Sequence, residues 1–259
     1  MRNTLLTAVG AIALMTSASF ADNTSTVTQS GNDNGATVTQ NAGTLGTSTI
    51  TQDGDNGTAT VKQIDDDLAA NSSEIIQQAT ADGAIATVTQ NNNGTTDPNT
   101  SNITQATDGN ATLNQKGEGN TSDIQQTDVA GLGVIANVSQ IGTFNSSFVS
   151  QDGSDNTATV TQNGGTNTST LTQDIDTSGS TASVTQTGDN NSSLVSQLAA
   201  IDNSMTVLQI GSDNMSTASQ SAGSLNEMTI EQKGDRNISD ASQVGDGNFI
   251  DLLQSGDDN

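Results

Sequence analysis

The sequence predicts an all-β fold, a two-sheet β-solenoid of about ten strand-turn-strand repeats of ~23 residues each, whose stacked strands form a cross-β, amyloid-forming column. Gln recurs about every twelve residues, small or apolar residues alternate with Thr or Ser before it, and Gly, Asn and Asp follow it. The stretch Gln151–Gln173, QDGSDNTATVTQNGGTNTSTLTQ, shows one repeat clearly. Composition excludes an ordinary core, because the chain is 30% hydrophobic with four Phe and no Trp or Tyr.

Residues 1–21 have the features of a bacterial secretory signal peptide. Arg2 provides the positive start, Leu5 to Met15 form the apolar run, and Ala18 to Ala21 fit a small-x-small cleavage site. The run is too short to span a bilayer, and no later segment is long and apolar enough. We therefore expect a signal peptide at 1–21, an exported solenoid at 22–259, and no transmembrane segment.

Each predicted strand ends in a Gln and carries small or apolar residues two and four positions before it. Side chains alternate along a strand, so these three positions share one face, and none of them is charged. We therefore place this face, including the Gln, in the interior. The strand-terminal residues are Gln29, Gln40, Gln52, Gln63, Gln77, Gln90, Gln105, Gln115, Gln126, Gln140, Gln151, Gln162, Gln173, Gln186, Gln197, Gln209, Gln220, Gln232, Gln243 and Gln254.

The residue four positions before the Gln alternates between Ser and Ala, as in Ser25 and Ala36. Met205, Met228 and Ile250 later take the place of the Ala. The true repeat is therefore two strands, and we expect strands of each kind to stack on their own kind, giving two faces with a shared interior.

Asn stands six positions before many of these Gln residues. Stacked Asn and Gln amides can bond to their copies above and below, which satisfies polar groups in a buried site. The predicted ladder residues are the strand-terminal Gln together with Asn34, Asn145, Asn156, Asn167, Asn191, Asn214, Asn237 and Asn248.

The predicted turns follow the pattern Gln-x-Gly-x-x-Asn, in which a Gly such as Gly153 permits the positive φ of a tight reversal. Three connectors, at 65–70, 91–98 and 127–133, are longer, and Pro98 lies in one of them. We expect these to be bulged loops on a continuous solenoid.

These motifs resemble the curlin repeat family, the subunits of bacterial curli fibres. The family pattern Gln-x-Gly-x-x-Asn-x-Ala-x-x-x-Gln appears from Gln151 to Gln162 and from Gln29 to Gln40. The resemblance implies that Gln, Asn and Gly at these positions are the self-assembly residues. The chain differs in its greater number of repeats, in Asn where the family usually has Ser before the first Gln, and in lacking the leader segment that guides export, since Ser25 follows Ala21 closely.

The resemblance also implies a function and partners. Curlins cross an outer-membrane secretion pore and polymerise on a nucleator or co-subunit into an extracellular amyloid fibre on the bacterial cell surface, which serves biofilm matrix, adhesion and aggregation. We expect this chain to be such a subunit, with itself as the main partner in a homopolymeric fibre.

Other chemistry is disfavoured. After cleavage four basic residues stand against 29 acidic ones, so the surface repels nucleic acid. With no His or Cys, and with Ser and Asp recurring in every repeat, we expect neither an enzyme nor a cofactor. Acidic turns such as Asp53–Gly57 lack the spacing of known calcium loops, so no metal site is expected.

One alternative stays open. Outward Thr-x-Thr pairs such as Thr37/Thr39 and Thr159/Thr161 would suit a monomeric secreted β-solenoid that binds ice or a surface.

Overall fold

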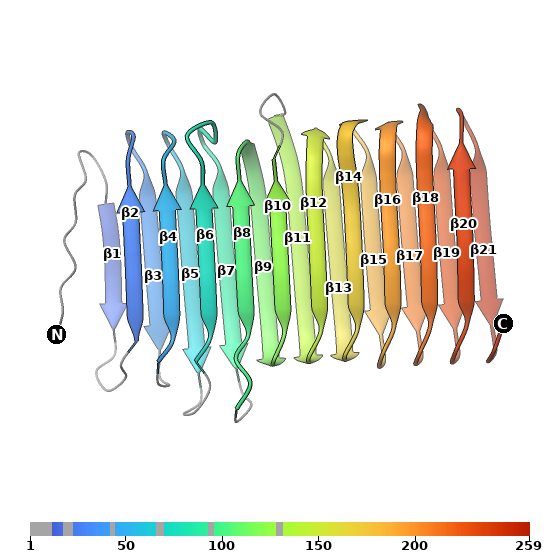
Figure 1. Cartoon of the computed structure of the whole chain (residues 1–259), viewed down its shortest axis with the longest axis horizontal. Helices are drawn as coiled ribbons and strands as arrows, with labels where there is room; N and C mark the ends of the chain where they lie inside the picture. Colours follow the sequence, from blue (N-terminus) through green and yellow to red (C-terminus); the bar gives the residue numbers. More distant parts are fainter. Residues whose placement is uncertain (1–11, 18–22, 42–44, 66–69, 93–95, 128–131) are drawn as a thin grey trace.

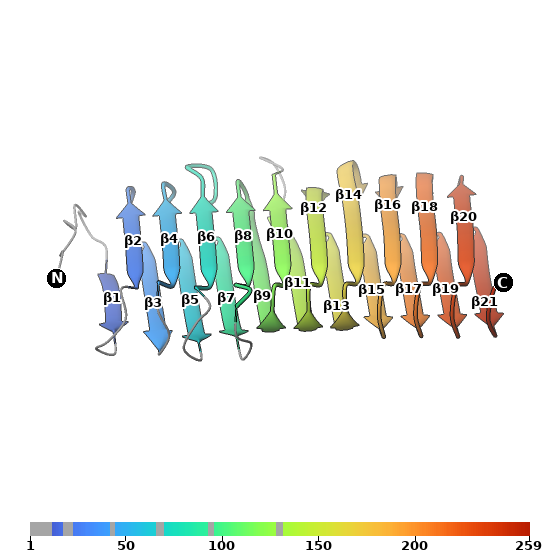
Figure 2. The same ribbon diagram turned by 60° about the horizontal axis from the view of Figure 1, so that its bottom comes forward.

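The computed structural model describes residues 12–17, 23–41, 45–65, 70–92, 96–127 and 132–259. Within these ranges the regular structure consists entirely of β-strands, all paired in parallel, in one sheet of eleven strands and one of ten. The strands cross the long axis of an elongated, two-layered molecule, and the first and last described strands lie at opposite ends of it (Figures 1 and 2). The predicted two-sheet β-solenoid is therefore confirmed, and the described ranges contain no helix that could span a bilayer.

Odd-numbered strands form one sheet and even-numbered strands the other. The odd sheet comprises β1 (Ile12–Ser17), β3 (Gly35–Asn41), β5 (Thr58–Asp65), β7 (Ile85–Asn92), β9 (Asp108–Glu118), β11 (Leu132–Thr143), β13 (Thr157–Gly165), β15 (Thr181–Thr187), β17 (Ser204–Ile210), β19 (Glu227–Lys233) and β21 (Phe249–Ser255). The even sheet comprises β2 (Thr24–Gln29), β4 (Thr47–Gln52), β6 (Ser72–Gln77), β8 (Thr100–Gln105), β10 (Thr121–Gln126), β12 (Ser146–Ser154), β14 (Thr168–Ser178), β16 (Ser192–Ile201), β18 (Met215–Ser224) and β20 (Ile238–Val244).

The two kinds of predicted strand are segregated between the sheets. In the even sheet Ser stacks on Ser, as Ser122 does on Ser147, whereas in the odd sheet Ala stacks on Ala, as Ala136 does on Ala158. The strand-terminal Gln of each rung is in register with that of the next rung in the same sheet, for example Gln126 with Gln151. The 23-residue, two-strand repeat is thus the structural unit.

Odd and even strands run in opposite directions, so the end of one faces the beginning of the other (Figure 1). Accordingly the amide of Gln63, at the end of the inward face of β5, donates to the carbonyls of Thr47 and Asn71 at the start of the even strands. Counting from these contacts, the Ala position of an odd strand faces the large apolar position of an even strand. Small side chains therefore pack against large ones across the core.

The C-terminal rungs reverse this size relation without enlarging the core. Met205 and Met228 replace Ala in β17 and β19, while the facing even-strand position changes from Ile, Leu or Val to Ala218 and Ala241. All four side chains are buried in one continuous apolar cluster. Close packing requires such compensation, because interiors tolerate neither voids nor overlap.

The N-terminal end has one strand more than the Gln repeat predicts. Ile12–Ser17, within the predicted signal peptide, forms β1 and pairs in parallel with β3, with Ile12 opposite Gly35 and Ser17 opposite Gln40. The rest of residues 1–21 lies outside the described ranges, as do the centres of the three predicted long connectors. Signal peptide cleavage stays a prediction.

Candidate functional site: side-chain ladders and the two ends of the solenoid

Two uninterrupted ladders of Gln side chains run along the interior, one behind each sheet. In every step Nε2 of the earlier Gln donates to Oε1 of the next, over 2.6 to 3.0 Å. All these Gln residues are buried except Gln254 at the C-terminal end, which is half-buried. The Gln predicted to face inward do so, and their amides pair with one another.

The backbone sets the direction of the Gln ladders. The second N–H of an amide donates to a carbonyl of the opposite sheet, as Gln140 Nε2 does to Thr121 at 2.9 Å and Gln209 Nε2 to Ser192 at 3.0 Å. A flipped amide would place its oxygen against that carbonyl oxygen. Each ladder therefore has a donor end, toward the C-terminus, and an acceptor end, toward the N-terminus.

A third ladder, of Asn side chains, lies at the turns between odd and even strands and has the opposite direction. Backbone N–H and Nδ2 of each later Asn donate to Oδ1 of the earlier one, at 3.0 to 3.1 Å. The ladder connects Asn99, Asn120, Asn145, Asn167, Asn191, Asn214 and Asn237. The Nδ2 groups also donate to turn carbonyls, as Asn167 Nδ2 does to the carbonyl of Gly188 at 2.7 Å.

The Asn column at the opposite turns is interrupted. Asn156 Oδ1 accepts from the backbone of Ser180, and Asn34 Oδ1 accepts from the backbone of Gly57. Asn248 donates its backbone N–H to Asn226 Oδ1 at 2.8 Å, but it is exposed at the end of the solenoid. The predicted Asn residues therefore all occupy turn positions that bond between rungs, though only one column is a continuous Asn ladder.

Glycine is required where successive turns touch. At Gly153 (φ +152°) a Cβ would lie 2.1 Å from the carbonyl oxygen of Thr177. At Gly164 (φ +132°) it would lie 2.0 Å from the carbonyl oxygen of Gly188. The predicted turn role of Gly153 thus has a second cause besides φ, namely the close stacking of the turns.

Aspartates in the turns form a set of contacts that the sequence pattern does not indicate. Oδ1 of the Asp that follows the turn Gly accepts the backbone N–H of the equivalent turn one rung earlier. Examples are Asp235 with Ser212 at 2.8 Å, Asp246 with Ser224 at 2.7 Å, and Asp55 with Asn32 at 2.6 Å. In the sequence the only sign of these contacts is that Asp recurs directly after the turn Gly, a pattern that acidic residues on a solvent-exposed surface also give. These carboxylates are hydrogen-bond acceptors between rungs as well as surface charges.

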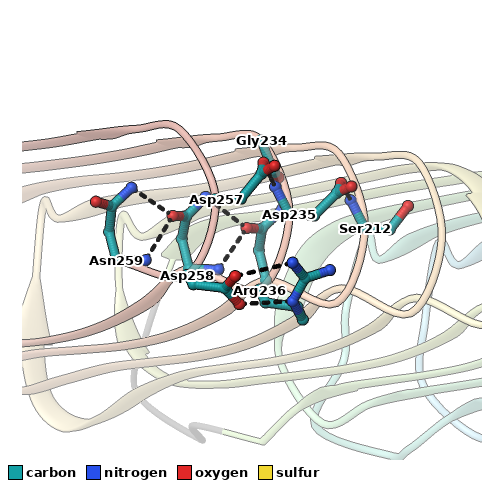
Figure 3. Close-up of polar contacts among 9 residues, drawn as sticks. Ser212, Gly234, Asp235, Arg236, Asp257, Asp258 and Asn259 are labelled. Atoms are coloured by element: carbon teal, nitrogen blue, oxygen red, sulfur yellow. Dashed lines mark hydrogen bonds and ion pairs between the residues drawn. The ribbon is translucent and has the colours of Figure 1, made fainter.

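Figure 3 shows these contacts at the C-terminal end. Asp257 accepts from the backbone of Asp235 at 2.9 Å, and Asn259 donates to Asn237 through its backbone and Nδ2. The Arg236 guanidinium makes two bonds to the Asp258 carboxylate, of 2.6 and 2.9 Å. This contact lowers the pKa of Asp258, chiefly through the hydrogen bond from Arg236. The last turn is therefore held to the preceding rung by ladder bonds and an ion pair.

The two ends of the solenoid carry unsatisfied ladder groups of complementary kind. Gln29 Oε1, at the N-terminal end, is buried and has no hydrogen-bond partner. At the C-terminal end Gln243 and Gln254 each donate one N–H to a backbone carbonyl, of Glu227 and Ile238, and none to a further Gln. Val27 at one end and Ile250 and Leu252 at the other are only partly covered by the core. Both ends therefore present apolar side chains and open hydrogen-bond positions.

In the described ranges no group of three or more His, Cys, Asp and Glu residues is arranged to hold a metal ion. Fold and ladders together define the chain as a parallel, two-sheet β-solenoid whose interior is bonded from rung to rung.

Comparison with known families shows which β-solenoid repeats this chain is similar to. Residues 136–164, 153–198, 177–221 and 202–234 match the family described as Curlin associated repeat, which confirms the resemblance to curlin repeats. No curated protein and no solved structure matches the chain. The rungs before residue 136 carry the same Gln ladders as the matched ones.

Proposed function

We propose that this protein is a structural subunit of an extracellular functional amyloid, a curli-like fibre that self-assembles by templated stacking of rungs and serves biofilm matrix, adhesion and surface aggregation. The observation that carries the proposal is that the solenoid repeats one rung along its axis and exposes that rung at its end. A further chain adds the same hydrogen bonds that already join the rungs within the molecule.

The C-terminal strands have the properties of a template. β20 and β21 are the last strands of their sheets, so one row of backbone N–H and C=O groups on each lacks a strand partner. Ile250 and Leu252 extend the apolar core to this surface. Backbone bonds then provide affinity, and the inward Gln and apolar residues provide register.

The family resemblance supports the wider context. Curlin repeats are found in structural subunits, and we propose secretion through an outer-membrane pore and fibre initiation by a nucleator or co-subunit. The ladder residues from Gln29 to Gln254 are, on this proposal, the assembly residues. They would act in the fibre as they act inside the chain.

Seeded growth tests the proposal. Residues 22–259 are diluted from denaturant and followed by thioflavin-T fluorescence, with and without sonicated preformed fibres, and the products are viewed by electron microscopy. We expect a lag that seeds abolish and unbranched fibres. A β-rich chain that stays monomeric with seeds present would refute fibre formation.

One observation favours a second candidate function. Thr37, Thr60, Thr87 and Thr112 are in register on the outer face of β3 to β9, which is the regular hydroxyl row expected of a surface-binding solenoid. The row is followed by Asn137 on β11, and Lys62 replaces Thr in the adjacent row. Ice recrystallisation measured on the monomer tests this function, and no inhibition by the monomer would exclude ice as the ligand.

A further inference from the structure

We infer that β2, β3 and the turn between them form a docking surface for the C-terminal end of a second copy, and that β1 covers part of this surface until the segment that carries it is removed. This inference rests on the proposed fibre function and specifies its joint. In the joint β20 pairs with β2 of the next copy, and β21 pairs with its β3.

The Gln ladders give the joint its polarity. Gln29 Oε1 is a buried acceptor without a donor, and Gln243 Nε2 has a donor left after its bond to Glu227. Placing β2 on β20 with the internal register brings these two groups together and continues the ladder. Two N-terminal ends would instead oppose acceptors, and two C-terminal ends would oppose donors, so like ends leave buried groups unpaired.

The turn beside this ladder is complementary in the same direction. Within the chain, the backbone N–H of the residue after the turn Gly donates to Oδ1 of the equivalent residue one rung later, as Ser224 does to Asp246 and Asn32 does to Asp55. Asp246 holds this position in the turn after β20, so its backbone N–H is the donor that this turn offers to the next copy. In the joint Asn32 of the second copy supplies the equivalent Oδ1. Its Nδ2 donates to Asp55 of its own chain, and its Oδ1 accepts no hydrogen bond from the described residues. Conversely Asn248 Oδ1 is an acceptor for the backbone N–H of Asn34, as Asn34 Oδ1 is for that of Gly57. The turn 244–248 thus fits the turn 30–34.

Side-chain volumes at the joint also match. The internal register places the small Ala241 on the larger Val27, and the large Ile250 on the small Ala36. At the joint the even-sheet column thus changes from small to large and the odd-sheet column from large to small, so the two columns compensate each other. The partly covered Val27, Ile250 and Leu252 become core residues.

β1 occupies the place that β21 needs. It lies on the free edge of β3 with Ser17 opposite Gln40, where the joint requires Gln254. Among the described residues no strand precedes β2 in the even sheet, so β1 blocks the half of the docking surface that β3 forms. Removal of residues 1–21 exposes both halves.

Engineered disulfides can test the joint, because the chain has no Cys of its own. The variant Asp240→Cys with Thr26→Cys places thiols on exposed outer positions that the joint makes direct neighbours. Parallel neighbours lie about 4.8 Å apart, within disulfide range. The control, Asp240→Cys with Thr49→Cys, moves one thiol a rung deeper, since Thr26 is in register with Thr49. Its thiols are then about 10 Å apart and out of range.

Fibres of residues 22–259 carrying each pair are oxidised, dissolved in denaturant and resolved without reductant. We expect covalent multimers from the first pair and monomers from the control. The two single variants test fibres in which like ends meet. Asp240→Cys alone forms cross-links only where two C-terminal ends meet, and Thr26→Cys alone forms them only where two N-terminal ends meet. Fibres whose subunits cross-link in the single variants, or not at all in the double one, overturn the joint, whereas absence of fibres overturns the fibre function itself.

The role of β1 is tested in the same assay with the whole chain, residues 1–259. We expect seeded growth and cross-linking at least tenfold slower than for residues 22–259. In the whole chain Leu14→Pro, which breaks the β1 ladder opposite Thr37, restores both, and Leu14→Val does not. Equal rates for the whole and shortened chains, or no recovery with Leu14→Pro, refute the covering role.

Discussion

Gln140 illustrates how much a single ladder residue contributes. Its Oε1 accepts from Gln115 at 2.9 Å, and its Nε2 donates to Gln162 at 2.8 Å, with all three side chains fully buried. A buried polar group that loses its partner costs about 1–3 kcal/mol, and this position supplies partners to two buried side-chain amides, besides the Thr121 carbonyl. Burying the Gln side chains therefore costs free energy, and their hydrogen bonds to one another offset that cost.

Replacement of this residue should be strongly destabilising. We expect Gln140→Leu to lower the free energy of unfolding by roughly 1–3 kcal/mol for each of the two orphaned groups, measured by urea denaturation of the monomer. Ser139→Ala, on the outer face one residue away, is the matched control and should change it little. If Gln140→Leu were as stable as the parent, the Gln ladder would set the register of the strands without adding to the free energy of unfolding.

Asp123 is a residue through which pH acts on the stability of the fold. Burial raises the pKa of its carboxyl, and hydrogen bonds from Gln125 and Asn102 oppose this rise only in part. The folded chain then holds this proton more tightly than the unfolded chain does. Its ionised form costs stability above the folded pKa, and this cost falls as the pH drops through that value and is gone below the pKa of the unfolded chain.

We therefore expect Asp123→Asn to raise the midpoint of urea unfolding at pH 7 and to give no gain at a pH below the ordinary pKa of an aspartate in the unfolded chain. Asp240→Asn, at the equivalent but exposed position of β20, is the control. A gain that is the same at both pH values would point to strand propensity as its source and not to ionisation.

At the scale of strands, the two sheets are coupled through side-chain volume. Met228 in β19 is fully buried, and Ala218 in β18 is the small residue that leaves room for it. Deleting a buried Met side chain costs about 2–5 kcal/mol, and adding methyl groups to a filled core costs about 1–3 kcal/mol. The pair therefore contributes through its combined volume.

A double-mutant cycle can measure this coupling. Met228→Ala and Ala218→Val should each be destabilising, and the double variant should be more stable than the sum of the two effects predicts, by about 0.5–3 kcal/mol. The measurement is the urea unfolding of all four chains. Strict additivity would show that the two side chains do not share one space.

At the scale of the whole molecule, charge opposes the assembly that the ends favour. The chain has a net charge of −24, and its acids recur in turns that stack in register. Asp235 and Asp257 occupy equivalent positions in successive turns, so a fibre continues the same columns of like charge. Part of this charge is used locally, as in the Asp258 pair with Arg236.

Salt should therefore accelerate fibre growth. Raising the ionic strength from 0.01 M to 0.15 M shortens the screening length from about 30 Å to about 8 Å, which weakens repulsion between an incoming chain and the fibre end. We expect the seeded elongation rate of residues 22–259 to rise severalfold over this range in NaCl. A rate that stays flat would indicate that turn charges do not limit addition.

The sequence alone predicts most of this architecture. Alternation along each strand assigns every strand residue to the inner or outer face, and the two-strand period assigns every strand to one of the two sheets. Ser25 and Ala36 assign strands to different sheets, and the uncharged positions at and before each Gln define the inner face. Every strand carries its inner-face residues in the same order, so the register that buries them places Gln on Gln.

Tertiary structure alone decides which groups face each other and in which direction they bond. That Met228 lies across from Ala218 follows from the opposite course of the two sheets, which no local pattern encodes. The donor direction of the Gln ladder depends on the second N–H finding a carbonyl such as that of Thr121, and the roles of Asp257 and β1 depend on what the neighbouring rung presents. These features arise from contacts 10 to 23 residues apart, and the spacing of the repeat allows these contacts but does not set their direction.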